Sequence, residues 1–195
     1  MQNAPAQGII TTVAGTGKSG FGGDGGAATM AEFKNPGSAI LDKHGNLLIL
    51  DQVNNCIRKI DTAGIVTTIA GMAGSKPGYN GDGILATKAT LAYPYDIKMD
   101  RFGNIYLADD VNFRIRKIDT AGIIHTIAGT GSEEYSGDGG AATKAEIYLP
   151  VGLAVDIFGN VYFSDNSNRV RKIDTSGIIT TVAGNGYLPG GGRRL

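Results

Sequence analysis

A pattern that recurs three times constrains the fold of this 195-residue chain more than any other feature. Glycine marks the pattern, because 31 residues are glycine, about 16% against a usual share of about 7%. Glycine at that level indicates either flexible low-complexity sequence or many tight turns, and a fixed period separates the two. The period here is fixed at 55 to 58 residues, as the Thr-Val-Ala-Gly type of segment shows at 10–15, 66–71, 124–129 and 179–184.

Each repeat predicts four β-strands, because its apolar residues alternate with a period of two. The first strand follows a proline, and an aspartate then opens a tight turn that closes on Gly-Asn. The third strand carries an Arg-Lys pair, and the fourth runs through the Thr-rich segment. Four antiparallel strands joined by short turns predict a β-propeller blade. The Arg-Lys pairs are Arg58-Lys59, Arg116-Lys117 and Arg171-Lys172.

A connection of roughly 20 residues leads into each repeat and contains a Gly-Asp-Gly motif. Its aspartates, Asp24, Asp82 and Asp138, precede helix-forming residues, and aspartate is a good N-cap. We therefore expect one short helix per connection, started by the aspartate side chain and ended before the proline.

These motifs resemble those of the NHL-repeat family. The recurring Thr-Val-Ala-Gly, Gly-Asp-Gly-Gly, Gly-Asn and Arg-Ile-Arg-Lys segments are most similar to its long-blade bacterial type, over residues 8–186. The resemblance implies a β-propeller, usually with six blades, used mostly as a binding or scaffolding surface. Related folds also include lyases, lactonases and sensor domains of receptor kinases.

The number of strands predicts an incomplete ring. The chain opens on a fourth-strand segment at 9–14 and then supplies three complete units, so one strand is surplus and three blades are fewer than the usual four to eight. We expect an all-β segment of three four-stranded blades plus one extra N-terminal strand, half of a six-bladed ring. The other half would come from a longer chain or from a second copy.

The predicted domain limits follow the repeats. Residues 1–7 form a polar leader, the propeller segment spans 8–186 in units of about 8–71, 72–129 and 130–186, and 187–195 form a flexible tail. The leader lacks the charged and apolar parts of a signal peptide, although it fits the polar start of a mature secreted chain. The family resemblance implies an extracellular or periplasmic location in a bacterium.

Charge and composition exclude several function classes. The 18 basic and 18 acidic residues cancel, so no net field recruits nucleic acid or anionic lipid. No segment approaches the roughly 20 apolar residues of a membrane span. The Arg-Lys pairs are each followed by an aspartate, and we interpret them as solvated strand faces with cross-strand partners.

Two sets of aspartates are candidate metal ligands. The weak calcium candidates are Asp24, Asp82 and Asp138, since carboxylates flanked by glycines can ligate calcium. Each loop offers one carboxylate per blade, so we favour a role in turn or helix capping and expect no metal and no cofactor. Three further aspartates end the second strands, and their identical repeat positions favour a structural turn: Asp51, Asp109 and Asp165.

No catalytic constellation is apparent. The two histidines, His44 and His125, occupy non-equivalent positions, Cys56 has no matching histidine, and no serine lies in a nucleophile-elbow context. A ligand face is instead expected where the units diverge at strand ends. The residues that fit are Tyr95, Asp96, Phe113, Arg114, Asn168 and Arg169.

Three functions remain open from the sequence. The preferred one is a non-enzymatic scaffold that binds a protein or glycan within a larger or dimeric assembly. A metal-dependent enzyme of the lyase or lactonase type is the alternative from another class, and it requires an asymmetric inward cluster of ligands. A purely structural repeat of a large surface protein is the third.

Overall fold

The computed structural model describes residues 8–186, so the predicted leader at 1–7 and tail at 187–195 lie outside the described residues. Its strands form three antiparallel sheets with the orders β1-β2-β3-β4, β5-β9-β8-β7-β6 and β10-β11-β12-β13. The first sheet contains β1 (Pro36–Leu41), β2 (Leu47–Asp51), β3 (Cys56–Ile60) and β4 (Val66–Ala70). The second contains β5 (Ile84–Leu85), β6 (Ile97–Met99), β7 (Ile105–Asp109), β8 (Arg114–Ile118) and β9 (Ile123–Ala128). The third contains β10 (Pro150–Val155), β11 (Val161–Asp165), β12 (Arg169–Ile173) and β13 (Ile179–Ala183).

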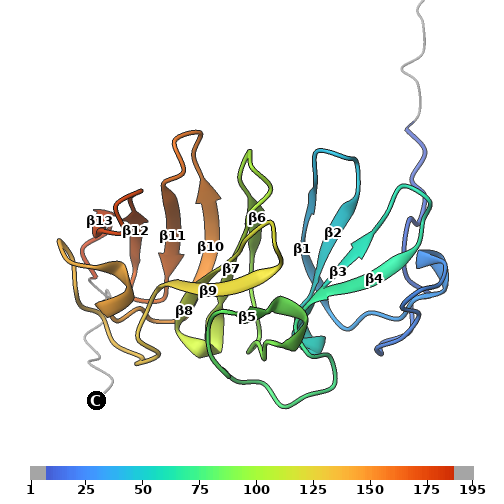
Figure 1. The fold of residues 1–195 in the computed structure, drawn as a ribbon, viewed down its shortest axis with the longest axis horizontal. Helices are drawn as coiled ribbons and strands as arrows, with labels where there is room; N and C mark the ends of the chain where they lie inside the picture. The colour runs from blue at the N-terminus through green and yellow to red at the C-terminus, as the bar shows by residue number, and fades with distance from the viewer. Residues whose placement is uncertain (1–7, 187–195) are drawn as a thin grey trace, which may run out of the picture.

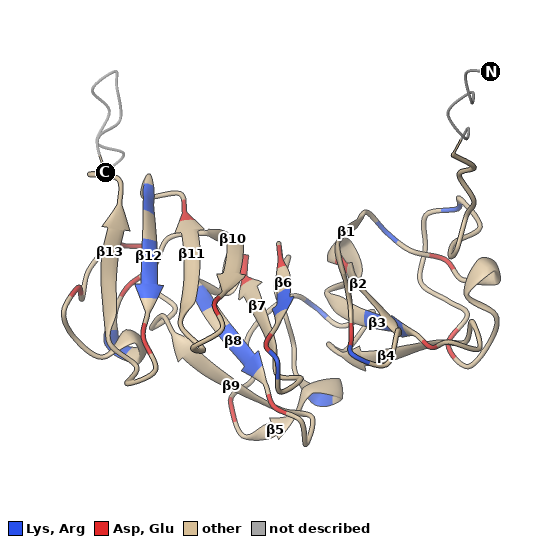
Figure 2. Ribbon diagram, turned by 90° about the horizontal axis from the view of Figure 1, so that it is seen from above, with Lys and Arg blue, Asp and Glu red and all other residues tan. Residues whose placement is uncertain are grey.

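The three sheets are arranged as propeller blades, which confirms the predicted fold class. Figure 1 shows them side by side, and Figure 2 shows them fanning out from their inner strands β1, β6 and β10. The outer strands β4, β9 and β13 lie at the periphery, and the side of the inner strands opposite the second blade is open (Figure 2). We call the sheets the first, second and third blade.

The hairpin turns between the first two strands of each blade form as the Asp and Gly-Asn residues predict. Asp42 accepts hydrogen bonds from the backbone N–H groups of His44 (2.8 Å) and Asn46 (2.9 Å), and Gly45 adopts a φ of 84°. Asp100 and Asp156 make the same bonds in the other blades. A side-chain carboxylate therefore replaces the missing backbone partners of a tight turn.

The core lies between blades rather than within each one. The face of the first blade that carries Ile57 and Ala70 packs against Ala86, Ala89 and Leu91 of the following connection. Backbone bonds fix the contact, since Gly71 N–H donates to the Ala86 carbonyl at 2.9 Å. The second and third blades meet in the same way, with Gly129 N–H donating to the Ala142 carbonyl at 3.0 Å. We call each contact between a blade and the next connection a joint.

The extra N-terminal strand is not formed, so that part of the prediction is wrong. Residues 9–14 carry the fourth-strand sequence, yet Ile9 and Ile10 are 90% and 97% exposed and no strand precedes β1 in the described chain. A fourth strand needs a third strand as its hydrogen-bonding neighbour, and within this chain β4, β9 and β13 already occupy those edges. The additional strand is instead β5, a short piece of the second connection that pairs with β9.

The predicted short helices are single 3₁₀ turns: η1 (Ala28–Met30), η3 (Ala86–Lys88) and η5 (Ala142–Lys144). Two further 3₁₀ turns join the second and third strands of the first two blades: η2 (Gln52–Asn54) and η4 (Asp110–Asn112). No side chain caps η1, η3 or η5, so the expected aspartate cap is absent. The aspartates of the Gly-Asp-Gly motifs have other partners, described below.

Among the described residues, no helix is long and apolar enough to cross a membrane.

Candidate functional site

Three buried arginines each make several polar contacts within the described chain. Arg58, Arg116 and Arg171 lie on the third strand of each blade and are 0% exposed. The sequence predicts solvated strand faces for them, and that prediction is wrong. Each guanidinium extends into the connection that leads into its own blade, where an aspartate receives it.

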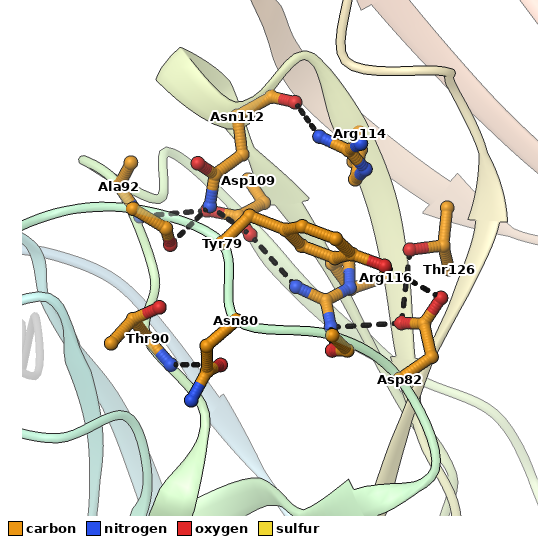
Figure 3. Close-up of polar contacts among 12 residues, drawn as sticks. Tyr79, Asn80, Asp82, Thr90, Ala92, Asp109, Asn112, Arg114, Arg116 and Thr126 are labelled. Carbon is orange, nitrogen blue, oxygen red and sulfur yellow. Dashed lines mark hydrogen bonds and ion pairs between the residues drawn. The ribbon is translucent and has the colours of Figure 1, made fainter.

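The second blade shows the arrangement clearly (Figure 3). Arg116 donates to Asp82 Oδ1 (3.0 Å), to the Gly81 carbonyl (2.9 Å) and to Asp109 Oδ2 (3.2 Å). Asp82 also accepts hydrogen bonds from the hydroxyls of Thr126 and Tyr79, both at 3.0 Å. One buried cation thus connects the second-strand end, the third strand and the connection of the same unit. We call this set of contacts the arginine latch.

The latch recurs in the other blades with small changes. Arg58 lies 2.8 Å from Asp24 and 3.5 Å from Asp51. Arg171 lies 2.7 Å from Asp138 and donates to the Ser136 and Glu146 carbonyls at 2.7 and 2.9 Å. Because the arginines are fully desolvated and bonded to carbonyls as well as carboxylates, they fix the connection to its blade.

An aromatic ring covers each latch. In the second unit Arg114 and Arg116 lie 3.9 and 4.9 Å from the centre of the Tyr79 ring. Tyr135 has the same role in the third unit, between Arg169 (3.6 Å) and Arg171 (4.7 Å). In the first unit Cys56 stands where the others have the outer arginine, and Phe21 contacts Arg58 alone, at 4.7 Å. Stacking of this kind strengthens the latch and uses the arginines for structure.

The aspartates at the ends of the second strands have the structural role predicted for them. Asp51 and Asp109 are 0% exposed, and Asp109 accepts hydrogen bonds from Ala92 N–H and Asn112 Nδ2, both at 2.8 Å. Burial raises the pKa of Asp109 to about 6, against the lowering effect of its hydrogen bonds and of Arg116. In the third blade Asp165 accepts from Ser167, and burial raises its pKa as well.

Asp110 is a polar group whose placement costs stability. Its Oδ1 is buried without a hydrogen-bond partner, and burial together with the neighbouring Asp109 charge raises its pKa to about 6. The equivalent position is Gln52 in the first unit and Asn166 in the third, so the fold accepts a neutral amide there.

Replacing Asp110 by asparagine is therefore expected to stabilise the protein by about 1 kcal/mol at pH 7, a value reduced from the full pKa shift because the side chain is only partly buried. A raised folded-state pKa means that stability falls as the pH rises from about 4 to 6, so the gain should be small at pH 4 and full at pH 7. Urea denaturation at both values measures it. Asp119→Asn is the matched control and should destabilise, because its carboxylate holds a turn.

The calcium candidates Asp24, Asp82 and Asp138 are engaged by the latches. In each of them Oδ1 is bonded to a buried guanidinium, so a calcium ion would have to displace an arginine. Within residues 8–186, no three His, Cys, Asp or Glu side chains lie close enough to hold a metal ion. The expectation of no metal and no cofactor remains a prediction.

The histidines and the cysteine show no reactive geometry. His125 Nε2 lies 3.4 Å from Asp119 Oδ2 on the periphery of the second blade, and His44 is exposed at a hairpin turn. Cys56 is 0% exposed, and burial raises the pKa of its thiol to about 12. A protonated, inaccessible thiol is a poor nucleophile.

The six predicted ligand residues lie in three places: Phe113 and Arg114 beside the second joint, Asn168 and Arg169 on the corresponding face of the third blade, and Tyr95 and Asp96 just before the inner strand β6. Asp96 accepts a hydrogen bond from Leu153 N–H of the next blade at 2.9 Å, and Tyr95 N–H donates to the Ala108 carbonyl. Phe113 stacks on Tyr148 of the next connection with ring centres 6.3 Å apart. Arg114 bonds to the Asn112 and Thr130 carbonyls, and Arg169 to those of Ser167 and Asn185. For Asp96 and Phe113 the divergence between units thus coincides with a side-chain contact to the next unit.

Asn168 and Arg169 lie at an uncovered joint surface. They line a hollow on the third blade together with Ser164, Asp165, Val170, Ala183 and Gly184. In the first blade the equivalent Asn55 accepts a hydrogen bond from Tyr93 N–H of the following connection at 2.7 Å. The structure therefore brings Asn168 and Arg169 together on the third blade, whereas Tyr95, Asp96, Phe113 and Arg114 belong to the second unit. A ligand site at these six residues remains a prediction.

The latch was missed because its residues are separated by a whole connection. Arginine and aspartate are 34 residues apart in the first two units and 33 in the third. The sequence does contain the signal, since one Arg and one Gly-Asp-Gly motif recur together once per unit at constant separation.

A family comparison assigns the chain. The model of the Teneurin NHL domain matches residues 75–135 and 130–191, which together cover more than half of the chain. The chain belongs to the teneurin NHL-domain family. It is similar to human teneurin-1, with 32% identity over 126 residues, 57% of this chain, and to mouse teneurin-4, with 28% identity over 185 residues, 83% of this chain. The chain spans only 5% of the length of human teneurin-1 and 6% of that of mouse teneurin-4.

Solved structures agree on the fold. An auxiliary nutrient binding protein from Bacteroides ovatus superimposes with a TM-score of 0.62 at 23% identity, over 80% of this chain and 40% of that one. A gluconolactonase from Xanthomonas campestris superimposes with a TM-score of 0.55 at 14% identity, over 76% and 47%. One neighbour is thus a binding protein and the other an enzyme, so the propeller fold by itself is compatible with both.

Proposed function

We propose that this chain is a non-enzymatic binding and scaffolding segment of a larger or dimeric NHL propeller, working outside the cell. The observation that carries the proposal is the uncovered joint surface of the third blade. Support for the non-enzymatic part comes from the latches, which use the aspartates of the three Gly-Asp-Gly motifs and three buried arginines for structure. The extracellular location is proposed from the similarity to the teneurins, and a bacterial source remains a prediction.

The residues of the uncovered joint surface occupy repeat positions that are buried in the other two blades. Ile57 and Ala70 of the first blade and Ile115 and Ala128 of the second are all 0% exposed. The equivalent residues of the third blade are Val170, which is 36% exposed, and Ala183, which is also exposed. An apolar surface of this kind favours association with another connection of the same type.

The first connection offers the complementary surface. Its residues Ala28, Ala31 and Phe33 pack on the first blade and are the repeat equivalents of Ala86, Ala89 and Leu91, which occupy the first joint. Ala28, Ala31 and Phe33 are 2%, 0% and 8% exposed, because the segment from Ala14 to Gly20 covers them, with Gly15 N–H bonded to the Ala28 carbonyl at 2.9 Å and Gly20 N–H to the Phe33 carbonyl at 3.1 Å. A blade from a longer chain, or the third blade of a second copy, would bind here by replacing the segment around Gly15, which now makes the bond that Gly71 and Gly129 make at the two joints.

The solution mass tests the dimeric form of the proposal. Two copies of this 20.2 kDa chain would give a dimer near 40 kDa by sedimentation, with six blades in all. Val170→Asp should shift it to monomer, since an uncompensated charge in an apolar contact costs several kcal/mol, whereas Leu85→Asp at the outer edge of the second blade should not. A stable wild-type monomer contradicts the dimeric form.

A metal-dependent enzyme of the lactonase type is the second candidate, favoured only by the shared fold. It requires an asymmetric cluster of metal ligands near the inner strands. Elemental analysis of the purified chain separates the two, because a stoichiometric metal ion would overturn the non-enzymatic proposal.

A further inference from the structure

The hairpin turns between the first and second strands of the three blades project on the same side of the molecule (Figure 1). Each turn has the form Asp-x-x-Gly-Asn, in which aspartate, glycine and asparagine make the turn and the two middle residues are structurally free. We call these middle residues the hairpin tips. They are Lys43-His44 in the first blade, Arg101-Phe102 in the second and Ile157-Phe158 in the third.

The tips are strongly exposed, and three of their six residues are apolar. Phe102, Ile157 and Phe158 are 62%, 74% and 75% exposed, and Leu41 beside the first tip is 68% exposed. Neither the fold nor the open joints require these side chains, because their contribution to the turn is only a backbone N–H, as in the bond from Phe158 to Asp156 at 2.9 Å. Single exposed apolar residues are common, but four on one side of a small domain indicate a contact surface.

The charges of the tips are unpaired and of one sign. Lys43 and Arg101 make no ion pair with another described residue, and Arg101 lies 4.7 Å from the centre of the Phe102 ring. The nearby carboxylates are turned into their own hairpins: Asn160 donates to Asp156 at 2.7 Å, and that bond holds the pKa of Asp156 below its ordinary value. The cations without an ion-pair partner are therefore at the first two tips, each next to a turn carboxylate that is occupied by its own hairpin, and the exposed apolar side chains are at the last two.

A groove joins the first and second tips. Its lining combines apolar and basic side chains with one carboxylate, that of Asp100, and consists of Leu41, Lys43, Met99, Asp100, Arg101 and Gly103. The inner strands β1, β6 and β10 lie next to one another, so the three tips follow one another along the arc of blades (Figure 2).

We propose that the hairpin tips form a docking surface for an extended protein segment that presents carboxylates to Lys43 and Arg101 and apolar side chains to Phe102, Ile157 and Phe158. This inference rests on the binding role proposed above for the propeller segment, and it specifies the class of partner as an acidic, partly apolar protein segment. Charge complementarity to Lys43 and Arg101 selects an acidic partner. Burial of Phe102 and Phe158 on binding would supply most of the affinity.

The test uses a fluorescein-labelled synthetic peptide with glutamates in its first half and leucine and phenylalanine in its second, measured by fluorescence anisotropy at low salt. The wild-type chain should bind it, and a version with lysine in place of glutamate should not bind. Phe158→Ser and Arg101→Glu should each weaken binding by about tenfold or more. The matched controls Leu85→Ser and Lys76→Glu, exposed away from the tips, should stay within about twofold of the wild type.

Three results would overturn the inference: no binding by the wild type, equal binding of the lysine peptide, or tip variants that bind as the wild type does. Circular dichroism melting checks that each variant is folded. Peptide binding is also measured on Val170→Asp, whose joint surface is distant from the tips. A monomeric wild type that still binds the peptide would contradict the dimer alone, whereas a dimer that does not bind it would contradict the docking surface alone.

Discussion

Replacing Arg116 by methionine is expected to lower the free energy of unfolding by about 3–5 kcal/mol, a large part of the stability of a domain of this size. Methionine keeps much of the side-chain volume but removes the cation that Asp109 and Asp82 share. Asp109 is 0% exposed, so its charge would remain in the interior without compensation. Urea denaturation followed by tyrosine fluorescence, together with hydrogen exchange of the second blade, measures the loss.

The loss should depend on pH in a defined direction. Without Arg116 the pKa of Asp109 rises beyond its present value of about 6, so the carboxyl is neutral in the folded variant at pH 5 and costs less there than at pH 8. Adding Asp109→Asn to Arg116→Met should recover part of the stability at pH 8. A loss that is equal at both pH values would contradict the assigned role of the pair.

Arg114→Met is the matched control. Arg114 lies two residues earlier on the same strand, touches the same Tyr79 ring and bonds only to the carbonyls of Asn112 and Thr130. Because it leaves no buried charge behind, we expect a loss of about 1 kcal/mol. If both arginines cost the same, the aspartates are not the reason for the burial of Arg116.

The contrast between these arginines shows what the sequence could predict and what it could not. Strand period, hairpin aspartates and positive-φ glycines are local, so the four-stranded blades follow directly from the repeat. The burial of Arg116 depends on Asp82, which precedes it by 34 residues. Without knowledge of that partner, a charged residue in a strand is predicted to be exposed to solvent. Local sequence patterns therefore predicted the strands of each blade correctly, but they did not predict that the arginines of the latches are buried.

The prediction of an extra N-terminal strand was wrong for a related reason. Residues 9–14 and β13 carry nearly the same sequence, but a strand exists only where a neighbour offers unpaired backbone groups. The six predicted ligand residues were chosen because they differ between units. The structure places part of that divergence at contacts between neighbouring units, where Phe113 stacks on Tyr148 and Asp96 accepts a hydrogen bond from Leu153 N–H, so variation there accompanies the packing of unlike neighbours.

The recurring glycine that ends each fourth strand provides the second large effect. Gly129 has a φ of 95°, and a Cβ added to it would collide with the carbonyl oxygen of Phe113 and lie 3.0 Å from Arg114 Cα. Both obstacles are backbone, so neither can move aside without shifting β8. Gly129→Ala is therefore expected to cost about 4 kcal/mol, from the left-handed conformation and the clash together.

Gly122→Ala separates these two contributions. Gly122 has a φ of 78° in the turn before β9, and an added Cβ meets nothing within 4 Å, so only the backbone conformation is penalised, by about 1 kcal/mol. Thermal and urea unfolding of both variants give the difference. Hydrogen exchange adds the location, because Gly129 N–H donates to the Ala142 carbonyl across the second joint. Faster exchange around η5 in Gly129→Ala, and unchanged exchange there in Gly122→Ala, would show that this glycine joins neighbouring blades. Equal losses in the two variants would mean that the close approach to Phe113 contributes nothing to stability.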